Sequence, residues 1–304
     1  MPCYNEAESL PKTVKILSRL ISEMVSKDEI SQNSFVLFVD DGSSDNTFEI
    51  LKNFKVECCK IIRLTRNMGH QYALLAGIHY VTGKVDCAIS IDADLQDDLN
   101  VIGLMVNEYK NGAHIVCGVR DDRGTDRVFK KLSAKMFYKI MKLFGVYLVE
   151  NHADFRLLSN AALNEIGKYK ETNLFLRGLF PLINLKLKTI SYSQGIRRFG
   201  QSKYSFRKMV SLALKGITSF SSTPIRIITI LGIFFFVVTM ILSIHVLYVY
   251  LIGRTVPGWA SITLPMYFLG GIQLLSLGII GEYISNIYKE TKRRPMYHVE
   301  SILD

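Results

Sequence analysis

An Asp-x-Asp pair follows an apolar run near the middle of the first half of the chain. The run is Cys87–Ile91, and Asp92, Asp94 and Gln96 come directly after it. A short apolar run indicates a buried strand, and carboxylates at its carboxyl end lie where open α/β sheets bind their ligands. Carboxylates suit Mg²⁺ or Mn²⁺, which keep several waters and share the other positions with substrate phosphates. Taken alone, the pair also fits a polar turn after a core strand.

Two further acidic segments have the same double interpretation. Asp40 and Asp41 follow the apolar run Phe35–Val39 and precede a glycine and two serines. Paired aspartates at the end of a strand can hydrogen-bond a nucleobase or ribose, and the glycine permits a tight turn. The segment Pro2–Glu8 combines turn residues with acids at a helix start, where a cap and the helix dipole favour them. Each segment taken alone also fits an ordinary polar turn or helix cap.

The elements that must position these acids alternate along the chain up to about Val119. Strands are predicted at Phe35–Val39, Lys60–Leu64, Cys87–Ile91 and His114–Gly118, with another candidate at Lys186–Tyr192. Helices are predicted at Glu6–Met24, Asn46–Asn53, His70–Val81 and Leu99–Asn111. This alternation predicts an α/β fold with a mostly parallel sheet and helices on both faces. His70 and His79, on one of these helices, are interpreted as surface or packing residues.

The net charge indicates the class of partner, and the cysteine content indicates the state of the thiols. Among the 304 residues, 37 Lys and Arg oppose 27 Asp and Glu, for a net charge of +10. This balance favours anionic partners, such as phosphorylated substrates, anionic lipid or nucleic acid. The five cysteines form no CxxC pair, which indicates reduced, buried thiols and neither a zinc site nor a disulfide framework.

Two long uncharged runs lie near the C-terminus. Ile227–Ile244, extended by Val246–Ile252, and Ala260–Gly281 are each long enough, at about 1.5 Å per residue, to cross a hydrocarbon layer of roughly 30 Å. The short link Gly253–Trp259 predicts a helical hairpin; two buried core helices are the alternative. Basic residues flank the hairpin on both sides, so the positive-inside rule places both termini and the globular domain in the cytoplasm.

These patterns give a domain organisation. We expect a globular domain over 1–200, an amphipathic juxtamembrane helix over 201–224, two transmembrane helices over 225–284 and a cytoplasmic basic tail over 285–304. Within the second region, Tyr204–Phe220 has basic and apolar residues at helical spacing, which favours a position at the membrane interface. Asn173–Pro181 has the same pattern and fits an interfacial or a core helix equally well.

Taken in order, the motifs closely resemble those of family 2 glycosyltransferases. Within that family they are most similar to the polyprenyl-phosphate glycosyltransferases, such as dolichol-phosphate mannose synthases and bacterial enzymes that glycosylate undecaprenyl phosphate. The motifs are Pro2–Glu6, Asp40–Asp45, Arg66–Gly77, Asp92–Gln96, Gly118–Arg120, Asp154–Leu158, Asn173–Gly178, Arg198–Ser205 and Tyr288–Pro295. The resemblance covers nearly the whole chain, including the two-helix anchor.

The resemblance implies a GT-A fold and transfer of a sugar from a UDP- or GDP-sugar to a polyprenyl phosphate, with Mg²⁺ or Mn²⁺ as cofactor. The implied donor-binding residues are Pro2, Tyr4, Glu6, Asp41, Asp92, Gln96, Arg198 and Ser202. The implied metal ligands are Asp92, Asp94 and Gln96, and the implied acceptor phosphate-binding residues are Arg120, Arg127 and Ser133. The catalytic candidates are Asp94, Arg120, Asp154 and Lys203.

The acceptor shapes the expected mechanism. A phosphate monoester is largely ionised near neutral pH, since its second pKa is about 6, so it can attack the anomeric carbon without a general base. We therefore expect a direct, inverting displacement, with Asp154 as an orienting residue or, where a base is needed, as that base. The expected setting is a multi-pass protein of the cell (inner) membrane that serves cell wall or lipopolysaccharide glycosylation. Undecaprenyl phosphate is the expected lipid in a bacterium, a homotetramer is one expected assembly, and nucleic acid is not an expected partner.

The chain departs from the family pattern at its start. In the family an apolar strand precedes Pro-x-Tyr-Asn-Glu, whereas Met1 stands directly before Pro2 here. Without that strand, we expect unpaired neighbouring ladders and an open core face. Two other functions are alternatives. A processive polysaccharide synthase would have Gln-x-x-Arg-Trp, but Arg198 follows Gln194–Arg197. A non-catalytic membrane scaffold or lipid-binding subunit should have lost Asp92 or Asp94, and both are present.

Overall fold

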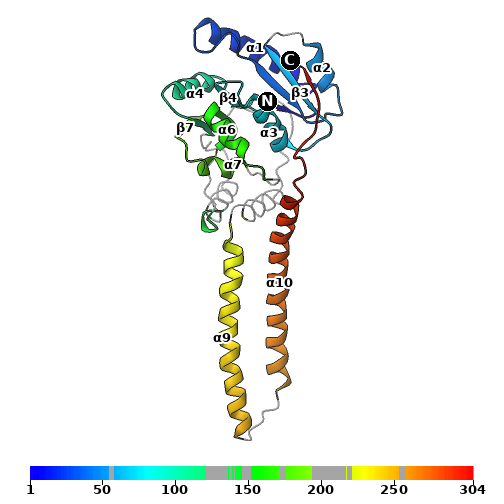
Figure 1. Ribbon diagram of the computed structural model, residues 1–304, viewed down its shortest axis with the longest axis vertical. Coiled ribbons are helices and arrows are strands. Elements are labelled where there is room, and N and C mark those ends of the chain that lie inside the picture. Colours follow the sequence, from blue (N-terminus) through cyan, green and yellow to red (C-terminus); the bar gives the residue numbers. More distant parts are fainter. Residues whose placement is uncertain are drawn as a thin grey trace.

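The computed structural model describes residues 1–54, 58–120, 136, 139, 141–145, 152–171, 176–193, 217, 221–252 and 258–303. A globular α/β part occupies one end, and two long helices extend from it side by side (Figure 1). The globular part is built from two four-stranded sheets rather than one.

The first sheet carries the N-terminal acidic segments. Its order is β1-β2-β3-β8, formed by Pro2–Cys3, Val36–Asp40, Cys59–Leu64 and Val299–Leu303. The first three strands are parallel, and β8 is antiparallel to β3. The C-terminal segment expected as a basic tail therefore ends in a strand of this first sheet, and Thr65 N donates to His298 O at 3.0 Å just before that strand.

The second sheet carries the Asp-x-Asp loop. Its order is β4-β6-β5-β7, formed by Cys87–Ser90, His152–Ser159, Ile115–Arg120 and Leu187–Tyr192. Strand β6 is antiparallel to both neighbours, while β5 and β7 are parallel. The expectation of a mostly parallel sheet is thus corrected to two mixed sheets. Strand β6 was not predicted because Asp154 and Arg156 interrupt its apolar pattern.

Four helices agree with the alternating pattern in order and type. They are α1 (Leu10–Ser26), α2 (Thr47–Asn53), α3 (His70–Val81) and α4 (Val101–Lys110). The structure adds α6 (Asn160–Lys168), which was not predicted, and α7 (Leu176–Leu179) with the 3₁₀ turn η1 (Phe180–Leu182) in the 173–181 segment. Helix α1 begins four residues later than predicted, since β1 and a turn occupy the first residues. Leu176, Leu179 and Phe180 are buried, so the described part of the 173–181 segment packs in the core.

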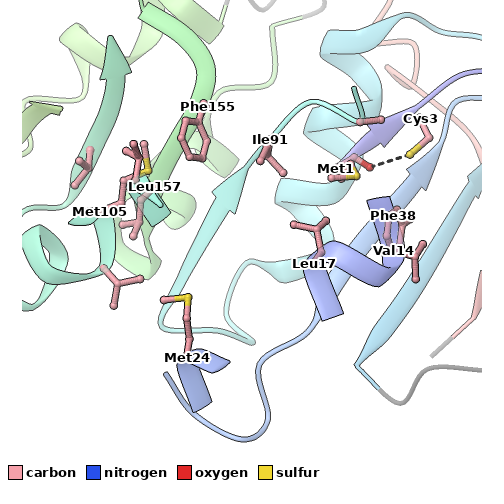
Figure 2. Close-up of a cluster of buried hydrophobic side chains, with 14 of the residues drawn as sticks. Met1, Cys3, Val14, Leu17, Met24, Phe38, Ile91, Met105, Phe155 and Leu157 are labelled. Atoms are coloured by element: carbon pink, nitrogen blue, oxygen red, sulfur yellow. Dashed lines mark hydrogen bonds between the residues drawn. The ribbon is translucent and has the colours of Figure 1, made fainter. Parts of the chain in front are cut away.

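An apolar cavity separates the two sheets. Figure 2 shows one buried cluster with Met105, Phe155 and Leu157 on one side, Met1 and Phe38 among those on the other, and more side chains between. A cavity of about 590 Å³ is lined there by Leu37 and Val39 of β2, Ile89 of β4 and Ile91 just after β4, among other residues. Among the described residues, β4 pairs with β6 alone.

Strand β1 pairs with only the C-terminal end of β2, and so covers only part of the cavity. The Met1 amino group donates to Leu37 O at 2.8 Å, Val39 N donates to Met1 O at 2.8 Å, and Asp41 N donates to Cys3 O at 2.9 Å. The ladder with β2 is therefore regular from Met1 onward, and the rest of the inner edge of β2 faces the cavity.

The two long helices are α9 (Thr223–Leu251) and α10 (Trp259–Thr291). The Phe235 and Phe268 rings contact across them at 5.7 Å between centroids, which confirms that they are neighbours. By length and apolar composition, within the described residues Phe268–Thr291 could cross a membrane, and Thr223–Phe235 is a shorter apolar segment. The pair of membrane spans expected over 225–284 stays a prediction. The interfacial helix expected at Tyr204–Phe220 lies outside the described residues, except Ile217.

Candidate active site

The end of β2 fixes the loop that precedes α3. Asp41 is almost completely buried, and its two carboxylate oxygens accept hydrogen bonds from Met68 N at 2.8 Å and Gly69 N at 2.9 Å. Burial raises the pKa of Asp41, and these two backbone bonds lower it. Asp41 therefore joins two loops; its predicted contact with the donor nucleoside remains a prediction.

The turn after Asp41 requires a glycine and holds the N-terminal motif. Gly42 has φ +63°, and a Cβ there would lie 2.4 Å from the Arg66 carbonyl carbon. Asn5 N donates to Ser43 Oγ at 3.0 Å, and Glu6 N donates to Thr47 Oγ1 at 2.8 Å. These bonds place Pro2–Glu6 against the Asp41 turn, so the two segments predicted to bind the donor lie together.

Within that segment the three predicted donor-binding residues differ in exposure. Pro2 is buried in β1, where it pairs with Val39, whereas the Tyr4 side chain is exposed. The Glu6 carboxylate accepts a hydrogen bond from Ser9 Oγ at 2.5 Å. Of the three, Tyr4 and Glu6 thus have side chains that solvent or a ligand can reach.

The Asp-x-Asp loop makes a tight turn directly after β4. Leu95 has a positive φ of 46°, and its N–H donates to Asp92 O at 3.3 Å. Gln96 donates to Asp94 through its side-chain Nε2 at 2.7 Å and its backbone N at 3.3 Å. The structure therefore brings Asp94 and Gln96 together, and their role as metal ligands stays a prediction.

His70 lies between two of the candidate carboxylates. It begins α3, and its Nε2 is 3.0 Å from Asp92 Oδ1 while its Nδ1 is 4.0 Å from Asp154 Oδ2. The interpretation of His70 as a surface or packing residue is thus incomplete, because its ring connects the end of β4 to β6. In the sequence, the signal for this position is that His70 directly follows a glycine. Gly69 has a φ of +98°, and α3 begins at the next residue, His70. His79 is a packing residue as expected, with Nδ1 2.8 Å from Tyr297 Oη.

Asp154 forms an ion pair with a buried arginine. Its Oδ1 accepts a hydrogen bond from Arg156 Nη2, and only 1% of the Arg156 side chain is exposed. The Arg156 guanidinium also lies over the Phe180 ring at 4.5 Å. Ser90 Oγ donates to the Asp154 backbone carbonyl at 2.6 Å, which ties β6 to the end of β4. Sequence reasoning missed Arg156, since an arginine in a strand is usually exposed.

Arg120, at the end of β5, is held by two residues that sequence reasoning also missed. Its Nη2 donates to Asp97 Oδ1 at 3.2 Å and its Nε donates to Tyr192 Oη at 3.3 Å, while Tyr192 Oη donates to the same Asp97 oxygen. Burial raises the pKa of both the Asp97 carboxyl and the Tyr192 hydroxyl. Asp97 comes from the Asp-x-Asp loop, so Arg120 and that loop share one anchor.

The donor atoms of this loop suit a hard divalent cation. Asp92, Asp94 and Gln96 offer two carboxylates and an amide oxygen, the ligand types that Mg²⁺ and Mn²⁺ prefer. Within the described residues, however, no group of three or more His, Cys, Asp or Glu side chains is arranged to hold a metal. The residues fit the cation in chemistry, and the metal site remains a prediction.

Five predicted site residues fall in parts of the chain that the structure does not describe. They are Arg127, Ser133, Arg198, Ser202 and Lys203. Their expected roles remain predictions: acceptor phosphate binding for Arg127 and Ser133, donor binding for Arg198 and Ser202, and catalysis for Lys203.

Comparison with known proteins identifies the family. Residues 1–167 match the family model described as glycosyl transferase family 2. The chain is 44% identical over 302 residues to the uncharacterized glycosyltransferase YkoT of Bacillus subtilis, a match that covers 99% of this chain and 90% of that protein. It is 36% identical to the prophage bactoprenol glucosyl transferase homolog of Escherichia coli, over 99% of this chain and 97% of that protein.

A third relative, the bactoprenol glucosyl transferase of Shigella phage SfX, is also 36% identical, over 99% of this chain and 97% of the phage protein. These matches span the globular part and both long helices. Together with the α/β architecture and the Asp-x-Asp loop at a strand end, they classify the fold as GT-A-like with mixed sheets. The chain belongs to glycosyl transferase family 2, and it is a glycosyltransferase.

Proposed function

We propose that the protein transfers a sugar from a nucleotide diphosphate donor to a polyprenyl phosphate of the bactoprenol type, at a membrane surface. The observation that carries the proposal is the shared anchor of Arg120 and the Asp-x-Asp loop through Asp97. This anchor keeps the Arg120 guanidinium close to the loop that carries the Asp92 and Asp94 carboxylates. A reaction between two phosphate-bearing substrates requires such positively charged and metal-binding groups side by side. The names of the full-length relatives support the choice of lipid acceptor.

The donor half of the reaction needs charge neutralisation. A nucleotide diphosphate leaves the sugar with developing negative charge, which cations positioned in advance stabilise. Asp92, Asp94 and Gln96 would hold Mg²⁺ or Mn²⁺, and when bound that cation supplies Lewis-acid stabilisation of the diphosphate. Tyr4 and Glu6 lie in the N-terminal segment that packs against the Asp41 turn, where the nucleoside would bind.

The acceptor half needs a bound, ionised phosphate and no proton transfer. Arg120, with Arg127 and Ser133, would bind the acceptor phosphate so that its oxygen attacks the anomeric carbon from the side opposite the leaving group. This direct displacement inverts the anomeric configuration. The pairing of Asp154 with Arg156 and its position near His70 support an orienting role for Asp154.

The helical pair would keep the site at the membrane, where the lipid phosphate lies. Apolar side chains such as Phe234, Leu274 and Leu275 are exposed along α9 and α10, as lipid-facing residues are. Thr223 Oγ1, at the start of α9, donates to Phe144 O at 3.3 Å and so connects α9 to the globular part. We propose two spans in the cytoplasmic (inner) membrane with the globular part on the cytoplasmic side.

A donor panel tests this function. The full chain in detergent or bacterial membranes would be incubated with Mn²⁺, undecaprenyl phosphate and each of several UDP- and GDP-sugars, and lipid products would be measured by mass spectrometry. One sugar should give a product heavier than the lipid phosphate by one glycosyl residue, and Asp94→Asn should abolish it. A wild-type chain that binds donor but forms no lipid-linked sugar would favour a non-catalytic lipid-binding subunit instead.

A further inference from the structure

One carboxylate oxygen joins the ends of three strands of the second sheet. Asp97 Oδ1, in the loop after β4, accepts hydrogen bonds from Arg120 at the end of β5 and Tyr192 at the end of β7. The Arg120–Tyr192 bond at 3.3 Å closes a three-membered network. Only 1% of the Asp97 side chain is exposed, against 37% for Arg120, so the network runs from the core to an accessible cation.

Packing fixes the tyrosine that completes the network. The Tyr192 ring meets the Phe155 ring edge-on, at 5.6 Å between centroids and an interplanar angle of 86°. A Cβ at Gly118 would lie 2.9 Å from Tyr192 Cε1 and 3.1 Å from the Phe155 ring, so the glycine leaves the space that these rings fill. Strand register places Arg120 directly opposite Tyr192 in the parallel β5–β7 pair. The hydroxyl therefore has a fixed position relative to the guanidinium.

We infer that Asp97 and Tyr192 are positioning residues: they hold the Arg120 guanidinium in the orientation that binds the acceptor phosphate. Within the described residues, the two bonds use the Nε–H and one Nη2–H of Arg120, and the remaining N–H groups are assigned to phosphate oxygens. Because Asp97 lies one residue after Gln96, the same network holds the Asp-x-Asp loop at a fixed distance from that phosphate. This inference rests on the proposed function.

A purely structural role makes a different prediction. A pair that only stabilises the sheet would lower activity through loss of folded protein, with or without Arg120. A positioning pair acts through Arg120, so its effect should disappear once the guanidinium is gone. The two roles can therefore be separated by a double-mutant cycle.

The cycle compares wild type, Tyr192→Phe, Arg120→Gln and the double variant, using the full chain in detergent. Tyr192→Phe keeps the packed ring and removes only the hydroxyl. We expect kcat/KM for undecaprenyl phosphate to fall about tenfold, as for loss of a hydrogen bond to a charged group, while KM for the nucleotide sugar changes by less than about twofold. In the Arg120→Gln background, Tyr192→Phe should cost less than about twofold.

Two further variants distinguish a specific effect on Arg120 from a general loss of folded protein. Asp97→Asn keeps an oxygen acceptor but removes the charge, and it should reduce kcat/KM for the acceptor in the same selective way. Tyr109→Phe removes a tyrosine hydroxyl on α4, outside this network, and should change no kinetic constant by more than about twofold. An equal Tyr192→Phe effect with and without Arg120, or no effect in either background, would overturn the inference.

Binding separates failure of this inference from failure of the proposed function. Should the wild type transfer no sugar, its affinity for a short-chain polyprenyl phosphate, such as farnesyl phosphate, can be titrated directly by calorimetry. The positioning role would be supported, even with no sugar transferred, if the affinity for the polyprenyl phosphate fell about tenfold in Tyr192→Phe and Asp97→Asn but not in Tyr109→Phe. Equal affinity in all variants, or no binding by the wild type, would contradict it.

Discussion

Replacing Asp154 with asparagine tests the ion pair beneath the candidate site. The change removes the negative charge that faces Arg156, a side chain with 1% exposure. Removing one partner of a buried ion pair typically costs about 3–5 kcal/mol, because a buried charge loses its compensation. Asp154 is itself 19% exposed and the Phe180 ring still faces the guanidinium, so solvent and the ring offset part of that cost. We expect about 2–3 kcal/mol of lost stability.

The assay is the thermal unfolding midpoint of the full chain in detergent. For a chain of 304 residues the expected loss lowers the midpoint by roughly 3–5 °C. The matched control is Glu165→Gln, which breaks the surface pair with Lys168, whose side chains are 40% and 67% exposed. That change should cost less than about 1 kcal/mol. The double variant Asp154→Asn with Arg156→Met removes both charges and should be more stable than Asp154→Asn alone.

Two results would refute the reasoning about this pair: equal midpoints for Asp154→Asn and Glu165→Gln, or a double variant no more stable than the single one. The same variant also tests the chemistry. General acid–base catalysis contributes about 10²–10⁴-fold, whereas an orienting role should cost less than about 10²-fold in turnover per folded molecule. A larger loss with donor and acceptor binding intact would contradict a base-free displacement.

The remaining predictions concern the turn at the end of β2. Burial raises the pKa of Asp40 above its ordinary value of 3.8, so the folded state binds the proton more tightly than the unfolded chain does. The contribution of Asp40 to stability is therefore greatest in acid and is lost as pH rises through the raised pKa. The thermal unfolding midpoint of Asp40→Asn, relative to that of wild type, should therefore increase from about pH 4 towards neutrality. A difference that is constant or decreasing across this range, measured by thermal unfolding, would contradict the burial argument. Gly42→Ala should destabilise by more than Gly83→Ala, because both residues have positive φ but only at Gly42 would a Cβ meet backbone, at 2.4 Å. Strain alone should make Gly83→Ala cost about 1–2 kcal/mol in thermal unfolding, and equal losses would mean that the turn moves to admit the methyl group.

The sequence predicts the parts of the site that local pattern determines. Asp41 and Asp92 lie at strand ends because each follows an apolar run, and period and polarity alone locate such runs. The contact of Asp94 with Gln96 is equally local. Family resemblance added the roles of these residues, which pattern alone left open between a turn and a site.

The parts that were missed depend on contacts between distant segments. Tyr192 lies 95 residues from Asp97, and no local periodicity reports that their side chains meet. Strand β6 was missed because a buried arginine looks exposed until its partner Asp154 and the Phe180 ring are known. Strand β8 was missed because its alternation is short and follows a basic segment. The charged residues were thus the least predictable, since their burial depends on partners rather than on their own polarity.

The most direct test of the central claim compares two acceptors that differ only in the phosphate. Membranes containing the full chain would be given the radiolabelled donor selected from the panel, Mn²⁺, and either undecaprenyl phosphate or undecaprenol, and the butanol-extractable label would be counted. If the phosphate is the nucleophile and Arg120 binds it, label should accumulate with undecaprenyl phosphate alone, and Arg120→Gln should reduce the rate by at least about tenfold. Equal labelling of undecaprenol, or a rate unchanged by Arg120→Gln, would contradict the account.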